Sequence, residues 1–199
     1  MCAYAADYDS GARYTSEALA AFPKDSRLHL AAGVLVELAV NTGVRSRRAL
    51  HDAENDYRRA LGYDETNVEA RLHLGWVLHL MDSDRAARDQ LRQVLAAAVS
   101  PEVAYLGRLF LGVLAENARD FAAAAEAYEG ARAIGPRHQT PYIALAALEG
   151  ARGNMRRARE LTSALAQLPE QKEEDPWWDY HLGRLDAAAL AWLRLKVRR

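Results

Sequence analysis

Apolar side chains recur along the chain in helical segments, and the signals of β-strands are nearly absent. There is no Asn-Gly or Asp-Gly dipeptide, and β-branched residues do not alternate with polar ones over any sustained stretch. All six prolines lie between apolar-periodic segments, where proline ends one helix or opens the next. The pattern predicts an all-α fold with helices near residues 6–22, 26–40, 45–61, 67–81, 84–99, 101–117, 120–134, 141–152, 155–168 and 176–197.

Several of these helices begin at recognisable capping residues. Ser100, Thr140 and Asp175 each precede a proline, which is the arrangement of an N-cap followed by proline at the first helical position. The stretch from Thr66 to Glu69 has the spacing of a capping box.

Small residues recur with a period near 34 residues. An alanine opens the second helix of each predicted pair, at Ala53, Ala87, Ala124 and Ala158, in steps of 34, 37 and 34 residues. A small residue recurs in the first helix of each pair, at Gly33, Gly75, Gly112 and Ala146. Its first step is longer because eight extra residues lie between Gly33 and Ala53. Two helices in each period of about 34 residues indicate a helical solenoid.

These positions resemble the tetratricopeptide repeat (TPR), in a bacterial type with degenerate repeats. The best unit, residues 105–138, contains in register Leu111, Gly112, Asp120, Phe121, Ala124, Tyr128, Ala131 and Pro136. The resemblance implies a right-handed superhelical solenoid of antiparallel helix hairpins in a single array. Its parts are a half repeat at 6–22, a repeat with an insertion at 26–66, repeats at 67–101, 105–138 and 139–169, and a C-terminal cap at 176–199.

Close packing explains the repeated residue types. The small residues let the two helices of a hairpin approach, and Tyr57, Leu91 and Tyr128 are expected to fill the space between one hairpin and the next. The polar stretch 170–175 is predicted to be a solvated linker. The C-terminal cap is expected to be a helix whose aromatic face covers the last hairpin, with Trp177, Trp178, Tyr180, Leu182, Leu185 and Trp192.

The search for catalytic or metal chemistry finds no motif. The formal net charge of −1 argues against a nucleic-acid binder, and no apolar stretch reaches the roughly 20 residues that cross a bilayer. One cysteine rules out a multi-cysteine metal site, and no two of the six histidines have the i, i+4 spacing of helical metal ligands. We therefore expect no enzyme activity, no cofactor, no metal, no nucleic-acid partner and no membrane insertion.

The inner face of the array is the predicted partner-binding surface. In the TPR register, the first helix of each unit lines a concave groove, and here that strip is mostly apolar, with Trp76 at its centre. A terminal-carboxylate clamp is unlike this strip, because it uses Lys, Arg and Asn. The alternative interpretation is that solenoid curvature buries some of these residues. The strip comprises Leu30, Val34, Leu38, Leu72, Trp76, His79, Leu80, Leu106, Leu109, Val113, Glu116, Ile143 and Ala147.

The insertion in the first full repeat carries three arginines, Arg45, Arg47 and Arg48. Eight extra residues amount to about two helical turns, so this hairpin is expected to project beyond its neighbours. The arginines have two interpretations: a contact for an acidic partner or phosphate, and a solvated helix start.

The resulting hypothesis is a non-catalytic scaffold or adaptor that binds a peptide or a partner protein. The alternative is a structural assembly element, or a fragment of a longer multidomain protein, that docks or forms a two-fold homodimer through an uncapped N-terminal helix. The expected location is the cytoplasm, with the periplasm as the alternative if the native N-terminus is missing. The face of the N-terminal helix that is expected to be uncovered carries Tyr4, Tyr8, Gly11, Ala12, Thr15 and Leu19.

Overall fold

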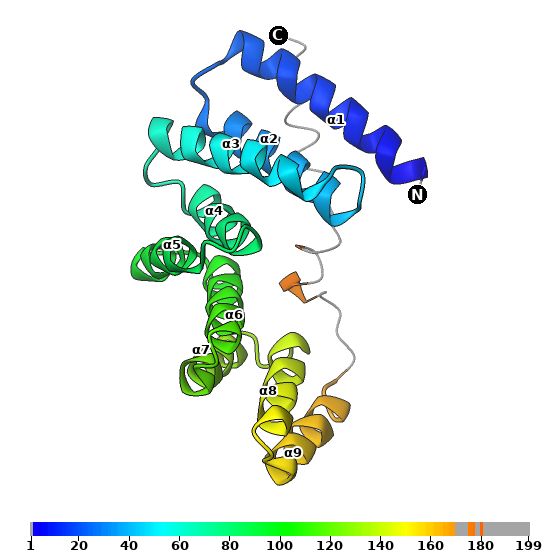
Figure 1. The fold of residues 1–199 in the computed structure, drawn as a ribbon, viewed down its shortest axis with the longest axis vertical. Helices are drawn as coiled ribbons and strands as arrows, with labels where there is room; N and C mark the ends of the chain where they lie inside the picture. The colour runs from blue at the N-terminus through cyan, green and yellow to red at the C-terminus, as the bar shows by residue number, and fades with distance from the viewer. Residues whose placement is uncertain (1, 170–174, 178–179, 181–199) are drawn as a thin grey trace. The chain divides into compact units, whose positions relative to one another are not determined.

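The computed structural model describes residues 2–169, 175–177 and 180, with side chains from residue 8 onward. All regular structure in this part of the chain is helical, which confirms the predicted all-α fold (Figure 1). The elements are α1 (Cys2–Ala21), α2 (Ser26–Asn41), the 3-10 turn η1 (Arg47–Ala49), α3 (Leu50–Tyr63), α4 (Val68–Leu80), α5 (Asp84–Ala96), α6 (Pro101–Asn117), α7 (Phe121–Ile134), α8 (Thr140–Ala151) and α9 (Met155–Ala166).

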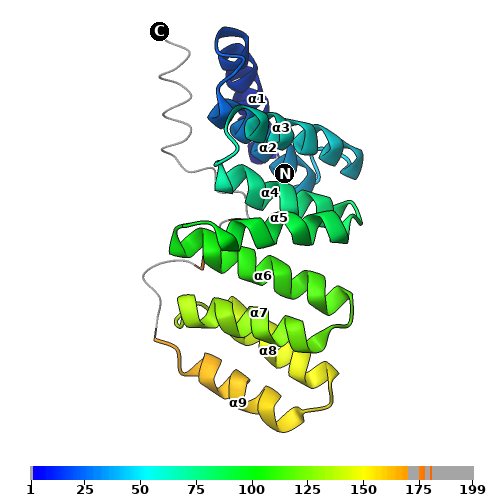
Figure 2. The same cartoon turned by 90° about the vertical axis from the view of Figure 1, so that its left-hand side faces the viewer.

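The helices form two compact units, and the boundary between the units lies within α5. The first unit contains the described residues up to Ala87 together with Tyr180, and the second contains those from Arg88 to Trp177. In the first unit, α1 packs on α2, α2 on α3, and α3 on α4; in the second, α6 packs on α7, α7 on α8, and α8 on α9 (Figure 2). Each helix therefore contacts chiefly its neighbours in the chain, as expected of a solenoid.

Two hairpins close through a tyrosine ring that lies over a glycine. A Cβ atom on Gly33 would lie 2.5 Å from Cε1 of Tyr57, and one on Gly112 would overlap the ring of Tyr128. Ala53 and Ala124, one turn before each tyrosine, are fully buried. The expected role of the small residues is confirmed here. Both tyrosines lie against the glycine of their own hairpin, and Tyr57 also stacks on His73 of α4 in the next hairpin, as expected.

The turns inside the hairpins repeat the same backbone conformation. Asp82, Arg119 and Gly153 have φ values of 60°, 58° and 79°, and they follow each other at 37 and 34 residues. These are the steps of the alanine series, so the left-handed residue is one more feature of the repeat. Of these three residues, only Gly153 is a glycine, the residue that adopts a positive φ without steric strain.

The predicted caps are correct at some helices and wrong at others. The Ser100 side chain accepts from the Val103 backbone N–H at 3.3 Å, as predicted. The predicted capping box places the N-cap of α4 one residue too early, at Thr66. The N-cap is Asn67, whose side chain accepts from the Ala70 N–H. The cap at Thr140 is also wrong, because this residue already belongs to α8 and makes no side-chain cap.

The insertion lengthens a loop more than it extends the hairpin. Helix α2 ends at Asn41, eight residues after Gly33, whereas α4 and α6 end five residues after their glycines. The chain then passes through Gly43, with a φ of 75°, and the 3-10 turn η1 before α3 begins at Leu50, five residues later than predicted. Three of the eight extra residues thus extend α2 and five lengthen the loop, so the expectation of about two added helical turns is wrong.

Helix α1 covers the N-terminal end of the first unit. Gly11, Thr15 and Ala18 are buried, and Leu35 of α2 lies 3.0 Å from the position of a Cβ on Gly11. The face expected to be uncovered is thus partly the face that packs on α2. From residue 8 onward, the exposed positions of α1 are polar, apart from Ala20 and Ala21, and include Asp9, Ser10, Arg13, Ser16 and Glu17. A polar outer face suits the end of a solenoid. Docking or pairing through this helix stays a prediction.

The predicted C-terminal capping helix lies mostly outside the described residues. Of the residues that are described, Pro176, Trp177 and Tyr180 are helical. The Trp177 ring packs on Phe110 of α6, and the Tyr180 ring stacks on His73 of α4. For these two aromatic residues, the expected position over the last hairpin, α8 and α9, is wrong.

Candidate functional site

Three side chains surround a buried carboxylate in the first unit. Glu37 lies on α2 and is 3% exposed, although the residues around it in the sequence are apolar. The Tyr57 hydroxyl of α3 donates to Glu37 Oε2 at 2.7 Å, and His73 Nδ1 of α4 lies 3.0 Å from the same oxygen. The Tyr180 hydroxyl donates to Glu37 Oε1 at 2.6 Å. We call Glu37, Tyr57, His73 and Tyr180 the tyrosine cluster.

The imidazole of His73 lies between two phenol rings of this cluster. Its ring centroid is 5.3 Å from that of Tyr57 and 4.9 Å from that of Tyr180, and both pairs are stacked within about 27° of parallel. His73 Nδ1 also lies 3.1 Å from the Tyr180 hydroxyl. Tyr180 is thus held on its ring face and at its hydroxyl at the same time.

The electrostatics of the cluster favour neutral phenols. Burial, and then the nearby charge of Glu37, raise the pKa of Tyr57 and that of Tyr180 well above the ordinary value. Both hydroxyls therefore keep their protons and donate to the carboxylate over the physiological range. This arrangement recognises a hydroxyl group but does not activate it as a nucleophile.

The same register position recurs in the other repeats with different partners. Four residues after the small residue come Glu37, His79 and Glu116. Glu116 accepts from the Tyr128 hydroxyl at 2.9 Å, and His79 Nδ1 lies 2.6 Å from Asp84 Oδ1. A glutamate stands at this position in the two repeats whose second helix carries a tyrosine. Leu91 replaces that tyrosine in the repeat with His79.

The second unit has a buried carboxylate of its own, Asp175. Its Oδ1 accepts from the Tyr105 hydroxyl at 2.7 Å and from the Trp177 N–H at 3.1 Å. Its Oδ2 accepts from the Thr140 N–H at 2.9 Å. Asp175 therefore caps two helix starts: that of the short turn at Pro176, as predicted, and that of α8.

The predicted groove residues are more buried than an open groove requires. Leu72, Trp76 and Leu109 are 2%, 7% and 1% exposed, so the idea of an open aromatic centre at Trp76 is wrong. These three residues fit the alternative interpretation, in which packing within the solenoid buries part of the strip. The remaining members of the predicted site are partly buried and retain some exposed surface: Leu30, Val34, His79, Leu80, Val113 and Glu116.

The three arginines of the insertion do not act as one group. Arg45 forms an ion pair with Asp52 at 2.8 Å, and Arg47 donates to the backbone carbonyl of Leu80 at the end of α4. Arg48 is exposed. Arg45 and Arg47 thus hold the loop in place, and only Arg48 is wholly directed to solvent.

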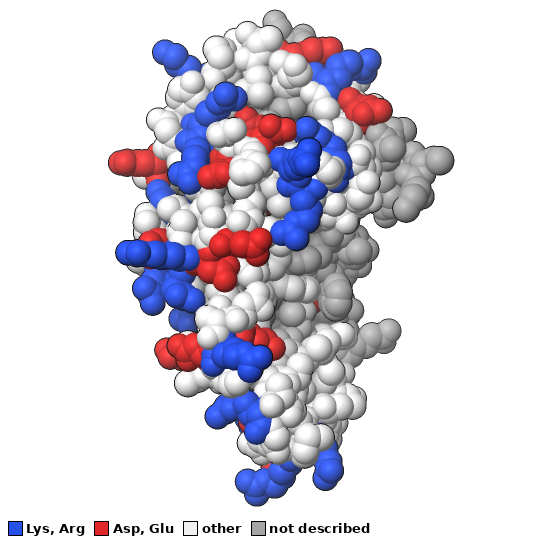
Figure 3. Space-filling model, in the orientation of Figure 1, with Lys and Arg blue, Asp and Glu red and all other residues white. Residues whose placement is uncertain are grey.

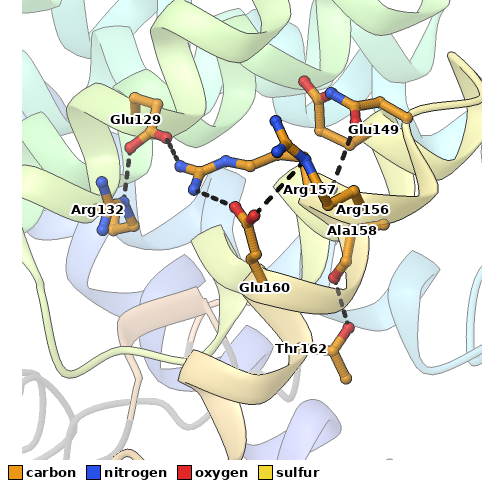
Figure 4. Close-up of polar contacts among 9 residues, drawn as sticks. Glu129, Arg132, Glu149, Arg156, Arg157, Ala158, Glu160 and Thr162 are labelled. Atoms are coloured by element: carbon orange, nitrogen blue, oxygen red, sulfur yellow. Dashed lines mark hydrogen bonds and ion pairs between the residues drawn. The ribbon is translucent and has the colours of Figure 1, made fainter.

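The outer surface carries mixed charges that pair with each other. Basic and acidic side chains are interspersed on the face shown in Figure 3. In the second unit, Arg157 of α9 lies 3.5 Å from Glu129 of α7 and 3.2 Å from Glu160, as Figure 4 shows. Such exposed pairs contribute about 0–1 kcal/mol each and do not indicate a site. Among the described residues, no group of three or more His, Cys, Asp or Glu side chains is placed to hold a metal ion.

Sequence reasoning missed the tyrosine cluster. It considered Tyr57 as a packing residue and Tyr180 as part of a distant cap, and it tested the histidines only for the spacing of metal ligands. The available signal was Glu37, a single acid in the apolar run from Leu28 to Val40. A buried charge needs partners, and a search for hydroxyl or imidazole donors starts from that residue.

Comparison with known proteins supports the fold. No protein-family model matches the chain, and no curated protein matches it. Among solved structures, the chain is similar to MamA, with 23% identity, a TM-score of 0.65 and coverage of 81% of this chain and 88% of the other. A MamA RS-1 ArsTM double mutant has 18% identity, a TM-score of 0.67 and coverage of 84% and 88%. PilF of Pseudomonas aeruginosa has 20% identity, a TM-score of 0.63 and coverage of 91% and 78%.

These likenesses, together with the repeat register, show that the chain has a TPR-like fold, a helical solenoid built from hairpins. No helix in the described part of the chain is long and apolar enough to span a membrane.

Proposed function

We propose that the chain is a non-catalytic scaffold that binds a peptide or a partner protein on the first-helix face of its repeats. The observation that carries this proposal is Tyr180. In the first unit, a residue from a distant segment of the chain is held on α2 and α4 by a hydrogen bond and a ring stack. A face that holds a residue of one distant segment has the chemistry to hold a residue of a partner.

The partly exposed members of the predicted strip complete the proposed surface in the first unit. Leu30 and Val34 lie on α2, and His79 and Leu80 lie at the end of α4. Apolar positions of this kind suit an apolar or amphipathic segment. In the second unit, the corresponding proposal rests on Val113 and Glu116 of α6, with Leu109 buried beneath them.

The test begins with identification of the partner by a photo-crosslinking residue placed at Val34. The same residue placed at Arg58, an exposed position of α3, is the control. We expect an adduct from position 34 that position 58 does not give. Affinity of the identified partner is then measured for Leu80→Gln and Arg58→Gln proteins of unchanged helicity.

Loss of affinity at Leu80 with none at Arg58 supports the proposal, and equal affinities contradict it. Trp76→Ala is unsuitable here, because loss of a buried tryptophan costs about 3–5 kcal/mol of stability and obscures any effect on binding.

A further inference from the structure

The tyrosine cluster has the features of a binding site whose occupant comes from the same chain. Three of its members, Glu37, Tyr57 and His73, lie on successive helices of one unit. The fourth, Tyr180, follows Glu37 by 143 residues and His73 by 107. The Tyr57 hydroxyl donates to one carboxylate oxygen of Glu37, Oε2, and His73 Nδ1 lies within hydrogen-bond distance of the same oxygen. The Tyr180 hydroxyl donates to the other oxygen, Oε1.

Removal of Tyr180 would leave a specific vacancy. Glu37 Oε1 would lose its phenol donor, and one face of the His73 ring would lose its stacking partner. Because a buried carboxylate oxygen without a donor is costly, the vacancy favours a group that restores both contacts. A phenol does this: its ring stacks on the imidazole and its hydroxyl reaches the carboxylate.

We propose that Glu37, Tyr57 and His73 form a tyrosine-binding socket, which Tyr180 fills in cis and which accepts a tyrosine of a partner peptide once Tyr180 is displaced. This inference rests on the proposed function and adds to it the class of ligand and a form of regulation. The C-terminal segment acts as an intramolecular competitor for the partner.

The register-equivalent glutamate provides an internal comparison. Glu116 also accepts from a tyrosine of its own hairpin, Tyr128, yet it is partly exposed to solvent. Water can satisfy its second oxygen, whereas Glu37 is 3% exposed and depends on protein donors. The additional hydroxyl contact is therefore a property of the first-unit socket and not of the repeat in general.

The socket chemistry defines its selectivity. A phenylalanine would stack on His73 but would leave Glu37 Oε1 unpaired, and sites built around a hydroxyl discriminate strongly against analogues that lack it. A phosphotyrosine would bring a second negative charge against the buried carboxylate of Glu37. The ligand class is thus an unmodified tyrosine within a peptide.

Tyr180 belongs to the same chain as the socket. A ligand that is covalently linked to its own site is present at a local concentration on the order of millimolar. A peptide with the same contacts in trans therefore competes poorly with Tyr180, and loss of Tyr180 should raise its apparent affinity.

The test uses the full chain and a fluorescent synthetic peptide carrying residues 178–187, followed by anisotropy. We expect the Tyr180→Ala chain to bind this peptide at least tenfold more tightly than the wild type. Tyr63→Ala, which removes an exposed tyrosine of the same unit, is the control and should bind as the wild type does. On the Tyr180→Ala chain, phenylalanine in place of the peptide tyrosine should weaken binding about tenfold, and phosphotyrosine should abolish it.

Equal affinities of the wild-type and Tyr180→Ala chains, or no binding by either, would overturn the proposal. A phenylalanine peptide as tight as the tyrosine peptide would overturn it as well. Tyr180→Phe provides a second variant that keeps the ring, and it should bind the peptide with an affinity between those of the other two chains.

An internal crosslink distinguishes the cis occupant from a second copy. A photo-crosslinking phenylalanine analogue at position 180, which keeps a ring that can stack on His73, should give an intramolecular adduct that leaves a monomer on a denaturing gel. A covalent dimer would overturn filling in cis. Since the peptide assay needs no natural partner, it can fail while crosslinking at Val34 succeeds, and the reverse outcome is equally distinguishable.

Discussion

At the scale of single residues, the hairpins are held together by contacts that leave no room for a methyl group. The ring of Tyr128 occupies the space where a Cβ atom of Gly112 would lie, and the ring of Tyr57 does the same at Gly33. Each ring then ends in a hydroxyl that needs an acceptor, and the glutamate one turn after the glycine supplies it. In two of the repeats, the glycine, the tyrosine and the glutamate therefore form one packing motif.

Gly112→Ala is expected to destabilise the protein by about 1–3 kcal/mol, because the added methyl group overpacks against Tyr128. The matched control is Gly150→Ala, also within a helix, where a Cβ would meet nothing within 4 Å. That change should raise stability by roughly 0.5–1 kcal/mol, since alanine favours the helix. Urea unfolding followed by circular dichroism measures both. Equal effects of the two substitutions would show that helix propensity, and not the tyrosine contact, determines the role of Gly112.

At the scale of elements, helix positions were predictable because each helix carries its own signals. Apolar-periodic segments separated by prolines, with the cap at Ser100, gave the bounds of α2, α6 and α7 to within one residue. Errors arose where a distant group took part. Thr140 has the sequence of an N-cap, yet the amide at the start of α8 is satisfied by Asp175, 35 residues later. No local pattern contains that information.

The same limit explains which part of the site was predictable. The register located the first-helix face and the glycine positions, because these follow from the repeat. It did not locate the tyrosine cluster, because Tyr180 lies outside the repeats and its contact with Glu37 spans 143 residues. The register also treated Trp76 as an exposed position, whereas burial depends on what packs against a helix face and not on its period.

Asp175→Ala is expected to cost about 2–4 kcal/mol in the second unit. It removes the cap of α8, worth about 1 kcal/mol, and leaves the buried Tyr105 hydroxyl without this acceptor, at a further 1–3 kcal/mol. Asp120→Ala is the control, since Asp120 is exposed and caps only its own helix, α7, through the Ala123 N–H. It should cost about 1 kcal/mol. Similar losses in the two variants, measured by urea unfolding, would argue against a shared role for Asp175.

At the scale of the whole molecule, the two units share one device, a buried phenol that donates to a carboxylate. Tyr57 and the partly buried Tyr180 provide it in the first unit, and Tyr105 and Tyr128 provide it in the second. Tyr57, Tyr105 and Tyr128 are at most 2% exposed. Both units should therefore respond to the ionisation of tyrosine, even though their helices differ in sequence.

Alkaline pH is accordingly expected to destabilise both units. Burial, followed by the neighbouring carboxylate, raises the pKa of Tyr57, of Tyr105 and of Tyr128 above the ordinary value near 10. A raised pKa means that the unfolded chain loses these protons at a lower pH than the folded chain. The stabilisation of the folded chain by these protonated hydroxyls is therefore complete below pH 10 and declines as the pH rises above it. Burial and the charge of Glu37 raise the pKa of Tyr180 as well. Each group loses about 1.4 kcal/mol per pH unit, so the four groups lose about 6 kcal/mol by pH 11.

The chain is well suited to this measurement because it has only three lysines, Lys24, Lys172 and Lys196, to titrate in the same range. The urea midpoint should be constant from pH 8 to 9.5 and should fall clearly by pH 11. A Tyr128→Phe chain, compared with its own value at pH 8, should lose about one quarter less, because phenylalanine has no proton to release. A midpoint that stays constant up to pH 11 would mean that these hydroxyls are not protected as the geometry requires. An equal loss in the wild-type and Tyr128→Phe chains would assign the effect to other groups.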